Sequence, residues 1–287
     1  MITSILSAMV PILLAALGGT LTERAGVLNI GIEGLILTGA FFSVVAVSAT
    51  GSMVAGLFAG AAAGVALSAV YSVACIELRA NIFVAGLATN LFAAGMIPFL
   101  SETFFGTRGV VRIAHDSSRI AGDPAIRTAV FALGSIAIAA AVAAILFRTP
   151  LGMRIRAAGG NPDALAVRGV SPSRYRRITM LASGAFAGIA GAEIATRLGV
   201  YVPNISAGRG WIALVAIFLG ARNPIGVVAA SVVFAGFEVL SGAAQGFTNV
   251  PGTLLLGVPF LVTLAAMIVY SIFGRRTRIQ GQPSPNE

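Results

Sequence analysis

The chain has 287 residues, of which 57% are hydrophobic and only 10% are charged. A soluble domain carries about a quarter charged residues, so this composition excludes an ordinary soluble protein. The formal net charge of +9 comes from nineteen basic residues, all arginine, against ten acidic ones. Most of these arginines stand in short segments between apolar runs, as in cytoplasmic loops of membrane proteins, rather than along a nucleic-acid-binding stripe. We therefore expect membrane lipid as the surrounding partner and no nucleic acid.

Apolar runs recur along the whole sequence. A helix needs about 20 apolar residues to cross a hydrocarbon core about 30 Å thick. Such runs occupy residues 3–20, 31–50, 53–76, 81–100, 127–147, 178–197, 210–221, 225–244 and 252–273. The predicted fold class is therefore all-α, a polytopic transmembrane bundle of about nine spans. The count ranges from eight to ten because the run at 210–221 is short. Residues 1–274 form one transmembrane domain, and residues 275–287 form a polar tail.

Small residues at four-residue spacing predict close contacts between helices. The sequence places Gly56, Gly60 and Gly64 in one span, and Gly184 and Gly188 in another. Such spacing lets two backbones approach each other in a membrane. It is common in membrane bundles and carries no specific function.

The second span is predicted to follow a broken segment. Residues 21–32 are more polar than the spans, and Asn29, Gly31 and Gly34 surround Glu33. A helix broken inside a membrane exposes backbone groups that a solute can contact. We therefore expect a broken or re-entrant segment at this place.

Polar side chains within the apolar runs are candidates for a substrate path. A charged group at the bilayer centre costs about 2.5–3.5 kcal/mol on insertion scales, so such groups usually face the interior and mark pathways. The candidates are Asn29, Glu33, Asn90, Glu193, Trp211 and Glu238. The alternative for the carboxylates is that they only bind neighbouring donors and fasten helices together. For Asn90, an interhelical hydrogen bond is the simpler interpretation.

The charges of the loops predict the orientation. Residues 148–177 hold seven arginines against one acid, and the tail 275–287 adds three more arginines, so both should be cytoplasmic. The loop 101–126 is mixed in sign, holds the only histidine, and should be extracytoplasmic. Nine spans then place the N-terminus outside and the C-terminus inside. Arg197 and Arg209 are left on the outer side as an exception to the rule.

The loop 148–177 is also predicted to contain a short helix. Asn161 can cap its N-terminus, Pro162 fits the first turn, and Asp163 favours the helix dipole. A short helix held outside the membrane is suited to receive a push from a soluble motor domain. A loop that only satisfies the charge rule is the alternative. The residues predicted for this coupling are Arg154, Arg156, Gly160, Asn161, Pro162, Asp163 and Gly169.

The sequence offers little for catalysis. It holds a single histidine, His115, and a single cysteine, Cys75, and no phosphate loop of the Gly-Lys-Ser/Thr type. We therefore expect no metal site, no cofactor bound by this chain and no hydrolysis of ATP by it. A membrane enzyme would lack both a nucleophile and metal ligands.

Three stretches resemble a known family. Residues 22–41 read TERAGVLNIGIEGLILTGAF and resemble the signature of permeases in the nucleoside and simple-sugar branch of ATP-binding-cassette (ABC) importers. Residues 151–170, with Gly-Asn-Pro, are similar to the coupling segment of these permeases. Residues 206–220, followed by Asn-Pro, resemble their late Gly-Arg-Gly motif. Residues 219–224 are less typical of the branch.

The resemblance implies a subunit that pairs with a second, related permease in the bacterial inner membrane. It also implies a cytoplasmic ATPase that uses ATP, and an extracytoplasmic binding lipoprotein that delivers the solute. Asn29 and Glu33 would lie on a discontinuous helix along the path, and Arg156 and residues 160–162 in the coupling segment. Related branches transport ribose-like sugars, branched-chain amino acids or riboflavin, so these solutes stay open. An ion-coupled secondary carrier, with Glu33, Glu193 or Glu238 as the ion-linked carboxylate, is the alternative from another class.

Overall fold

The computed structural model describes residues 1–113 and 123–244, and this part is almost entirely helical. Seven of its helices are long and apolar enough to cross a membrane, which confirms the all-α polytopic bundle. They are α1 (Ile2–Arg24), α2 (Ile32–Thr50), α3 (Met53–Ser72) with its π-helical continuation η1 (Val73–Glu77), α4 (Ile82–Phe105), α6 (Pro124–Arg148), α9 (Pro172–Leu198) and α11 (Pro224–Ala244). The predicted span at 252–273 and the tail lie outside the described residues.

The predicted span at 210–221 is a short helix, α10 (Arg209–Leu219). Its 11 residues rise about 16 Å, roughly half the thickness of the hydrocarbon core. The helix therefore reaches only part of the way across a bilayer, and its first residue lies inside the bundle. Gly208, which has a φ of +81°, directly precedes this helix.

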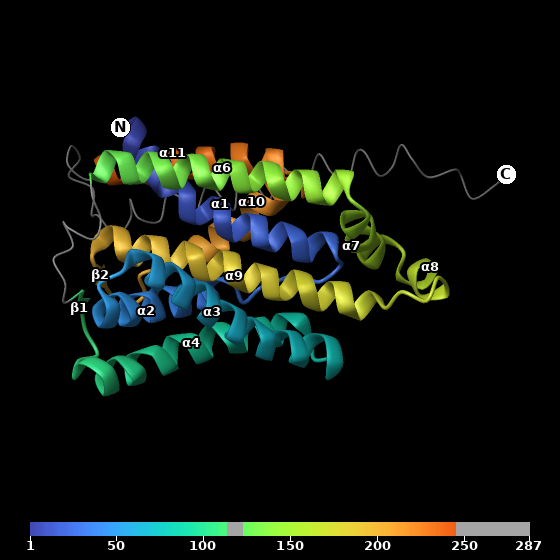
Figure 1. Cartoon of the computed structure of the whole chain (residues 1–287), viewed down its shortest axis with the longest axis horizontal. Helices are drawn as coiled ribbons and strands as arrows, with labels where there is room; N and C mark the ends of the chain where they lie inside the picture. The colour runs from blue at the N-terminus through green and yellow to red at the C-terminus, as the bar shows by residue number, and fades with distance from the viewer. Residues whose placement is uncertain (114–122, 245–287) are drawn as a thin grey trace.

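The long helices run side by side along the longest axis of the molecule (Figure 1). Helices α1 and α9 lie in the middle, α6 and α11 along one side, and α2, α3 and α4 along the other. Two further helices, α7 (Pro150–Gly160) and α8 (Pro162–Val167), project beyond one end of the bundle. We call this end the α7–α8 end. The N-terminus lies at the opposite end.

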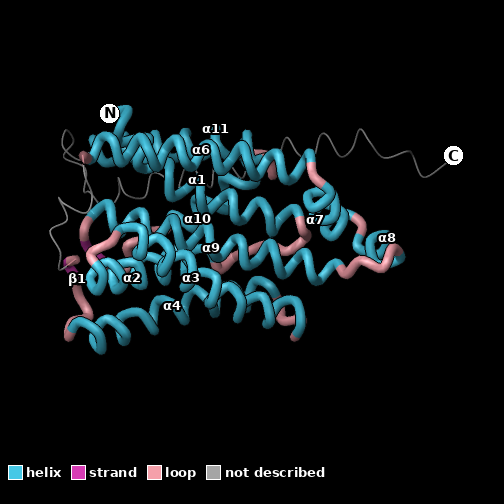
Figure 2. Tube along the Cα trace, viewed as in Figure 1, coloured by secondary structure: helices cyan, strands magenta, loops and turns pink. Residues whose placement is uncertain are grey.

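The opposite end carries the only strands of the described part. Strand β1 (Val111–Arg112) pairs antiparallel with β2 (Val200–Tyr201), and the tube in Figure 2 shows this pair at the end of the bundle. Tyr201 lies edge-on to Phe41 of α2, with ring centroids 5.4 Å apart. The pair therefore ties the connection after α4 to the connection after α9. His115 lies in the connection between β1 and α6, outside the described residues.

Direct backbone contacts join α2, α3 and α9. A Cβ atom at Gly188 would overlap the carbonyl group of Gly60 and lie 3.1 Å from the Cα atom of Ala61. A Cβ atom at Gly64 would overlap the carbonyl group of Gly184. The predicted glycine faces therefore meet each other, and the helices approach more closely than side chains would allow.

The connection between α6 and α9 runs from Thr149 to Ser171. It is shorter than the predicted loop 148–177 because α9 begins at Pro172, and its first turn extends beyond the apolar run. The connection also contains two helices where the sequence indicated one. The additional helix, α7, begins with a Thr149 side chain that accepts a hydrogen bond from the Gly152 N–H at 3.2 Å, and with Pro150 in its first turn.

Candidate functional site

The predicted break lies between α1 and α2. Residues 25–31, which we call the break segment, are not helical, and most of them are buried. Backbone N–H and C=O groups inside a membrane protein require hydrogen-bond partners from the protein, because lipid offers none and an unsatisfied group costs several kcal/mol. The break segment is therefore stable only where neighbouring helices supply such partners.

Helices α3 and α4 supply such partners. The Tyr71 hydroxyl of α3 accepts a hydrogen bond from the Ile30 N–H at 3.4 Å and lies 3.3 Å from the carbonyl oxygen of Leu28. The Asn90 amide of α4 donates to the Ile30 carbonyl at 3.0 Å and accepts from the Gly34 N–H at 2.8 Å. Asn90 thus forms hydrogen bonds between helices, as the simpler interpretation of this residue predicted.

Asn29 orders the break segment from within. Its side-chain oxygen accepts a hydrogen bond from the Gly31 N–H at 3.0 Å, and its amide nitrogen donates to the Ser183 hydroxyl of α9 at 2.8 Å. The residue is 1% exposed. Asn29 therefore joins the break to α9 in this structure, and contact with a passing solute stays a prediction.

Glu33 connects the break to α10. It stands in the first turn of α2, yet its carboxylate lies at the N-terminus of α10. One oxygen accepts hydrogen bonds from the Ser206 hydroxyl at 2.5 Å and the Gly208 N–H at 2.9 Å, and the other accepts from the Gly210 N–H at 2.7 Å. The first N–H groups of a helix lack partners within it and favour a negative charge. Glu33 therefore caps a helix that lies more than 170 residues further along the chain.

The other two carboxylates form ion pairs with the two exceptional arginines. Glu238 of α11 pairs with Arg209, the first residue of α10. Glu193 of α9 is almost fully buried and pairs with Arg197 one turn later, at 3.0 Å. The arginines that broke the orientation rule are therefore neutralised within the bundle. One oxygen each of Glu193 and Glu238 is buried without a protein hydrogen bond.

The six predicted path residues thus separate into groups. Asn29, Glu33 and Asn90 gather at the break, and Glu238 reaches the same place through Arg209. Trp211 is 40% exposed on α10, so it does not belong to this buried group. Tyr71 and Ser183 were not predicted from the sequence, and Ser206, Gly208 and Gly210 were recognised only as part of the Gly-Arg-Gly motif. A survey of hydroxyl groups within the spans would have found the first two.

The predicted helix in the connection between α6 and α9 is confirmed as α8. The Asn161 side chain accepts a hydrogen bond from the Ala164 N–H at 3.1 Å, Pro162 begins the helix, and Gly169 follows its end with a φ of +75°. Asp163 is exposed in the first turn. The connection is therefore ordered as helices, and its role in coupling stays a prediction.

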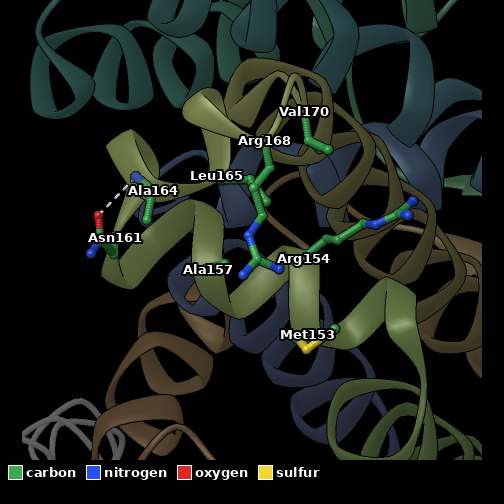
Figure 3. A pocket seen from close by; sticks show the side chains of 8 residues that line it. All are labelled: Met153, Arg154, Ala157, Asn161, Ala164, Leu165, Arg168 and Val170. Atoms are coloured by element: carbon green, nitrogen blue, oxygen red, sulfur yellow. Dashed lines mark hydrogen bonds between the residues drawn. The ribbon is translucent and has the colours of Figure 1, made fainter.

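A cavity of about 470 Å³ lies between α7 and α8 (Figure 3). Its lining residues are Met153, Arg154, Ala157, Asn161, Ala164, Leu165, Arg168 and Val170. Arg154 donates to the Tyr175 hydroxyl of α9 at 3.1 Å, while Arg168 is exposed to solvent. The two helices therefore form one unit held on α9, with an open cavity on its surface.

Arg156 and Gly160 differ from this pattern. The Arg156 guanidinium lies over the Phe147 ring, 5.4 Å from its centroid, and Arg24 approaches the same ring at 5.6 Å. Arg156 therefore packs α7 against α6, on a ring that Arg24 of α1 also contacts. Gly160 has open space where a Cβ atom would lie. Among residues 1–113 and 123–244, no three His, Cys, Asp or Glu side chains gather in a way that could hold a metal ion.

Comparisons with known proteins agree with these features. The family described as "Branched-chain amino acid transport system / permease component" matches residues 1–269. The guanosine ABC transporter permease protein NupQ of Bacillus subtilis is 32% identical over 279 residues, covering 90% of this chain and 87% of NupQ. The nucleoside ABC transporter permease protein NupC of Lactococcus lactis is 31% identical over 281 residues, covering 91% and 88%.

A third relative comes from an archaeon. The putative glucose ABC transporter permease protein TsgC13 of Haloferax volcanii is 30% identical over 287 residues, covering 93% of this chain and 86% of TsgC13. No solved structure matches the chain. The matches span the break, α10 and the α7–α8 unit, so this chain belongs to the permease family of branched-chain amino acid transport systems and is a permease subunit of an ABC importer.

Proposed function

We propose that this permease transports nucleosides or related simple-sugar solutes across a bacterial inner membrane. The observation that carries the proposal is the similarity of nine-tenths of the chain to permeases described for guanosine and for nucleosides. A relative described for glucose keeps simple sugars within the same class. Both kinds of solute carry hydroxylated rings that weak polar contacts can accept and release.

A separate cytoplasmic ATPase is the proposed source of energy, with ATP bound and hydrolysed there. The α7–α8 unit projects beyond the spans and would receive this partner (Figure 1). Val167 of α8 is 89% exposed, and Met153 of α7 is exposed beside the open cavity. Exposed apolar side chains on a projecting helix favour a protein partner at that surface. This assignment places the α7–α8 end in the cytoplasm.

A second, related permease is the proposed partner within the membrane. No passage runs between α2, α3 and α9 where their backbones touch at Gly39, Gly60 and Gly188. A nucleoside cannot pass between backbones in contact, so the path would run along an outer face that two subunits share. A binding lipoprotein would deliver the solute at the β1–β2 end.

The alternative of an ion-coupled carrier has little support. Its candidate carboxylates already have fixed partners: Glu33 accepts three hydrogen bonds, and Glu193 and Glu238 are paired with arginines. Membership in a family of ABC permeases also argues against it. Branched-chain amino acids and riboflavin are kept as other solutes for the experiment to test.

Uptake into proteoliposomes tests the proposal. The chain is reconstituted with its candidate permease, ATPase and binding-protein partners, and uptake of radiolabelled guanosine is measured with ATP, without ATP and with each component omitted. We expect uptake only with ATP and the complete set. Competition by unlabelled glucose, ribose, leucine or riboflavin identifies the preferred solute. Uptake by this chain alone under an ion gradient would contradict the proposal.

A further inference from the structure

The α7 helix touches the break segment directly, backbone against backbone. A Cβ atom at Gly159 would overlap the Arg24 carbonyl oxygen and lie 2.7 Å from the Gly26 nitrogen. A Cβ atom at Gly26 would lie 2.8 Å from the Gly159 Cα atom, and Gly26 has a φ of +81°. Only glycine fits both positions, because neither contact leaves room for a side chain and a φ of this sign is strained for other residues.

One arginine spans the same contact. The Arg176 guanidinium of α9 donates to the Ala25 carbonyl at 3.3 Å and to the Ala158 carbonyl at 3.0 Å. These carbonyls belong to the break segment and to α7, so a single planar group holds the two backbones together. Side chains can absorb a small shift by changing rotamer, whereas a backbone contact clamped in this way cannot.

The contact lies close to the groups that order the break. Two residues separate Gly26 from Asn29, which bonds to α9, and Glu33 follows with its three hydrogen bonds to the N-terminus of α10. A displacement of α7 would therefore reach the starts of α2 and α10 through a short stretch of backbone that hydrogen bonds from α3, α4 and α9 hold in place. The α8 helix lies beyond α7. Among the described residues, it forms no hydrogen bond with the break segment.

We propose that Gly26, Gly159 and Arg176 form a rigid joint through which movement of the α7–α8 unit shifts the break segment and the N-terminus of α10. These three are positioning residues that act through Asn29 and Glu33. The inference rests on the proposed function, because it requires an ATPase that moves the α7–α8 unit. A position between two sites does not by itself demonstrate coupling between them. The test must therefore separate a defect in coupling from a defect in docking.

Gly159→Ala is the decisive variant, and Gly134→Ala in α6 is its matched control. Both add one methyl group inside a helix, but only the first meets backbone atoms. In the reconstituted importer we expect Gly159→Ala to lower solute uptake per ATP hydrolysed by about five- to tenfold, within the range of typical coupling between sites. ATP hydrolysis and co-purification of the ATPase should stay at the wild-type level. Gly134→Ala should leave all three quantities unchanged.

Arg176→Gln provides a second variant in case Gly159→Ala fails to assemble. Its control is Arg174→Gln, at an exposed position two residues earlier. Arg176→Gln should reduce the same ratio, while Arg174→Gln should not. Hydrogen exchange gives a readout independent of transport: a non-hydrolysable ATP analogue on the ATPase should alter amide exchange in residues 27–31 of the wild type, and much less in Arg176→Gln.

Two results would overturn the joint. One is a wild-type ratio of uptake to ATP hydrolysis in both Gly159→Ala and Arg176→Gln. The other is a parallel loss of uptake and ATP hydrolysis, which would place the defect in docking. Failure of the proposed function is recognised separately, because the wild-type importer itself would then show no ATP-dependent uptake.

Discussion

At the scale of single residues, Glu33 has the most distinctive surroundings in the described structure. A carboxylate near mid-membrane depth is costly unless its oxygens are hydrogen-bonded. Glu33 meets this condition with two backbone N–H groups and one hydroxyl, all from the segment that begins α10. Its charge therefore has a structural use before any solute is considered, since it stabilises the start of a helix that begins inside the bundle.

Glu33→Gln should reveal this use. The amide nitrogen of glutamine would face an N–H donor, and the loss of charge removes the interaction with the helix N-terminus. We expect the free energy of unfolding to fall by about 1–3 kcal/mol in an SDS titration of the purified protein. Glu102→Gln is the control, because Glu102 forms an exposed ion pair with Arg108 and should change stability by at most about 1 kcal/mol. Equal effects of both substitutions would show that the contacts of Glu33 are not special.

At the scale of elements, glycine decides how closely α3 and α9 pack. The contact of Gly188 with the Gly60 carbonyl joins two helix backbones with no side chain between them. Without a hydrophobic drive between helices in lipid, such close packing and its dispersion attraction stabilise the bundle. The same contact leaves no passage between α3 and α9 at this point, so it influences both stability and the course of any path.

Gly188→Ala and Gly134→Ala form a matched pair for this contact. Both glycines lie inside transmembrane helices, but a Cβ atom at Gly134 of α6 meets nothing within 4 Å. Alanine alone favours a helix over glycine by about 1 kcal/mol, so Gly134→Ala should be neutral or stabilising. Gly188→Ala should lower stability by about 1–3 kcal/mol, because the overlapped atoms belong to a backbone. SDS titration measures the stability of both variants. An unchanged stability of Gly188→Ala would mean that α3 and α9 can move apart to accommodate a methyl group.

At the scale of the whole molecule, the two ends of the bundle differ in composition and shape. The α7–α8 end carries the arginines of the connection between α6 and α9. The β1–β2 end carries the N-terminus and the strand pair (Figure 1). Positively charged loops stay on the cytoplasmic side during insertion. The N-terminus and the connection after α4 should therefore face outward.

Labelling of single cysteines tests this orientation. In a Cys75→Ser background, which removes the only natural cysteine of the chain, one new cysteine replaces Thr103 near the end of α4 or Val167 in α8. Both positions are exposed, Val167 by 89%. A membrane-impermeant maleimide should label T103C in intact cells and V167C only after permeabilisation. The reverse pattern would invert the proposed orientation and place α7 and α8 outside the cell.

Local signals in the sequence determined which elements form. The length of each apolar run reflects the thickness of the bilayer core, and all predicted spans within the described residues correspond to helices. Asn161, Pro162 and Gly169 determined the ends of α8 because capping depends on residues close together in the chain. The break at residues 25–31 was also readable from its polar and glycine residues. The Thr149-Pro150 start signal of α7 is equally local, but no helix was predicted from it.

Only the tertiary structure decided which groups meet. The donors of Ser206, Gly208 and Gly210 that Glu33 caps lie more than 170 residues away, and no local pattern encodes such a distance. The same holds for Arg209 with Glu238 and for Gly26 with Gly159. The sequence indicated that buried carboxylates need partners, because an unpaired charge in a membrane is too costly. Helix packing selected those partners, since direction and depth in the bundle depend on all the spans together.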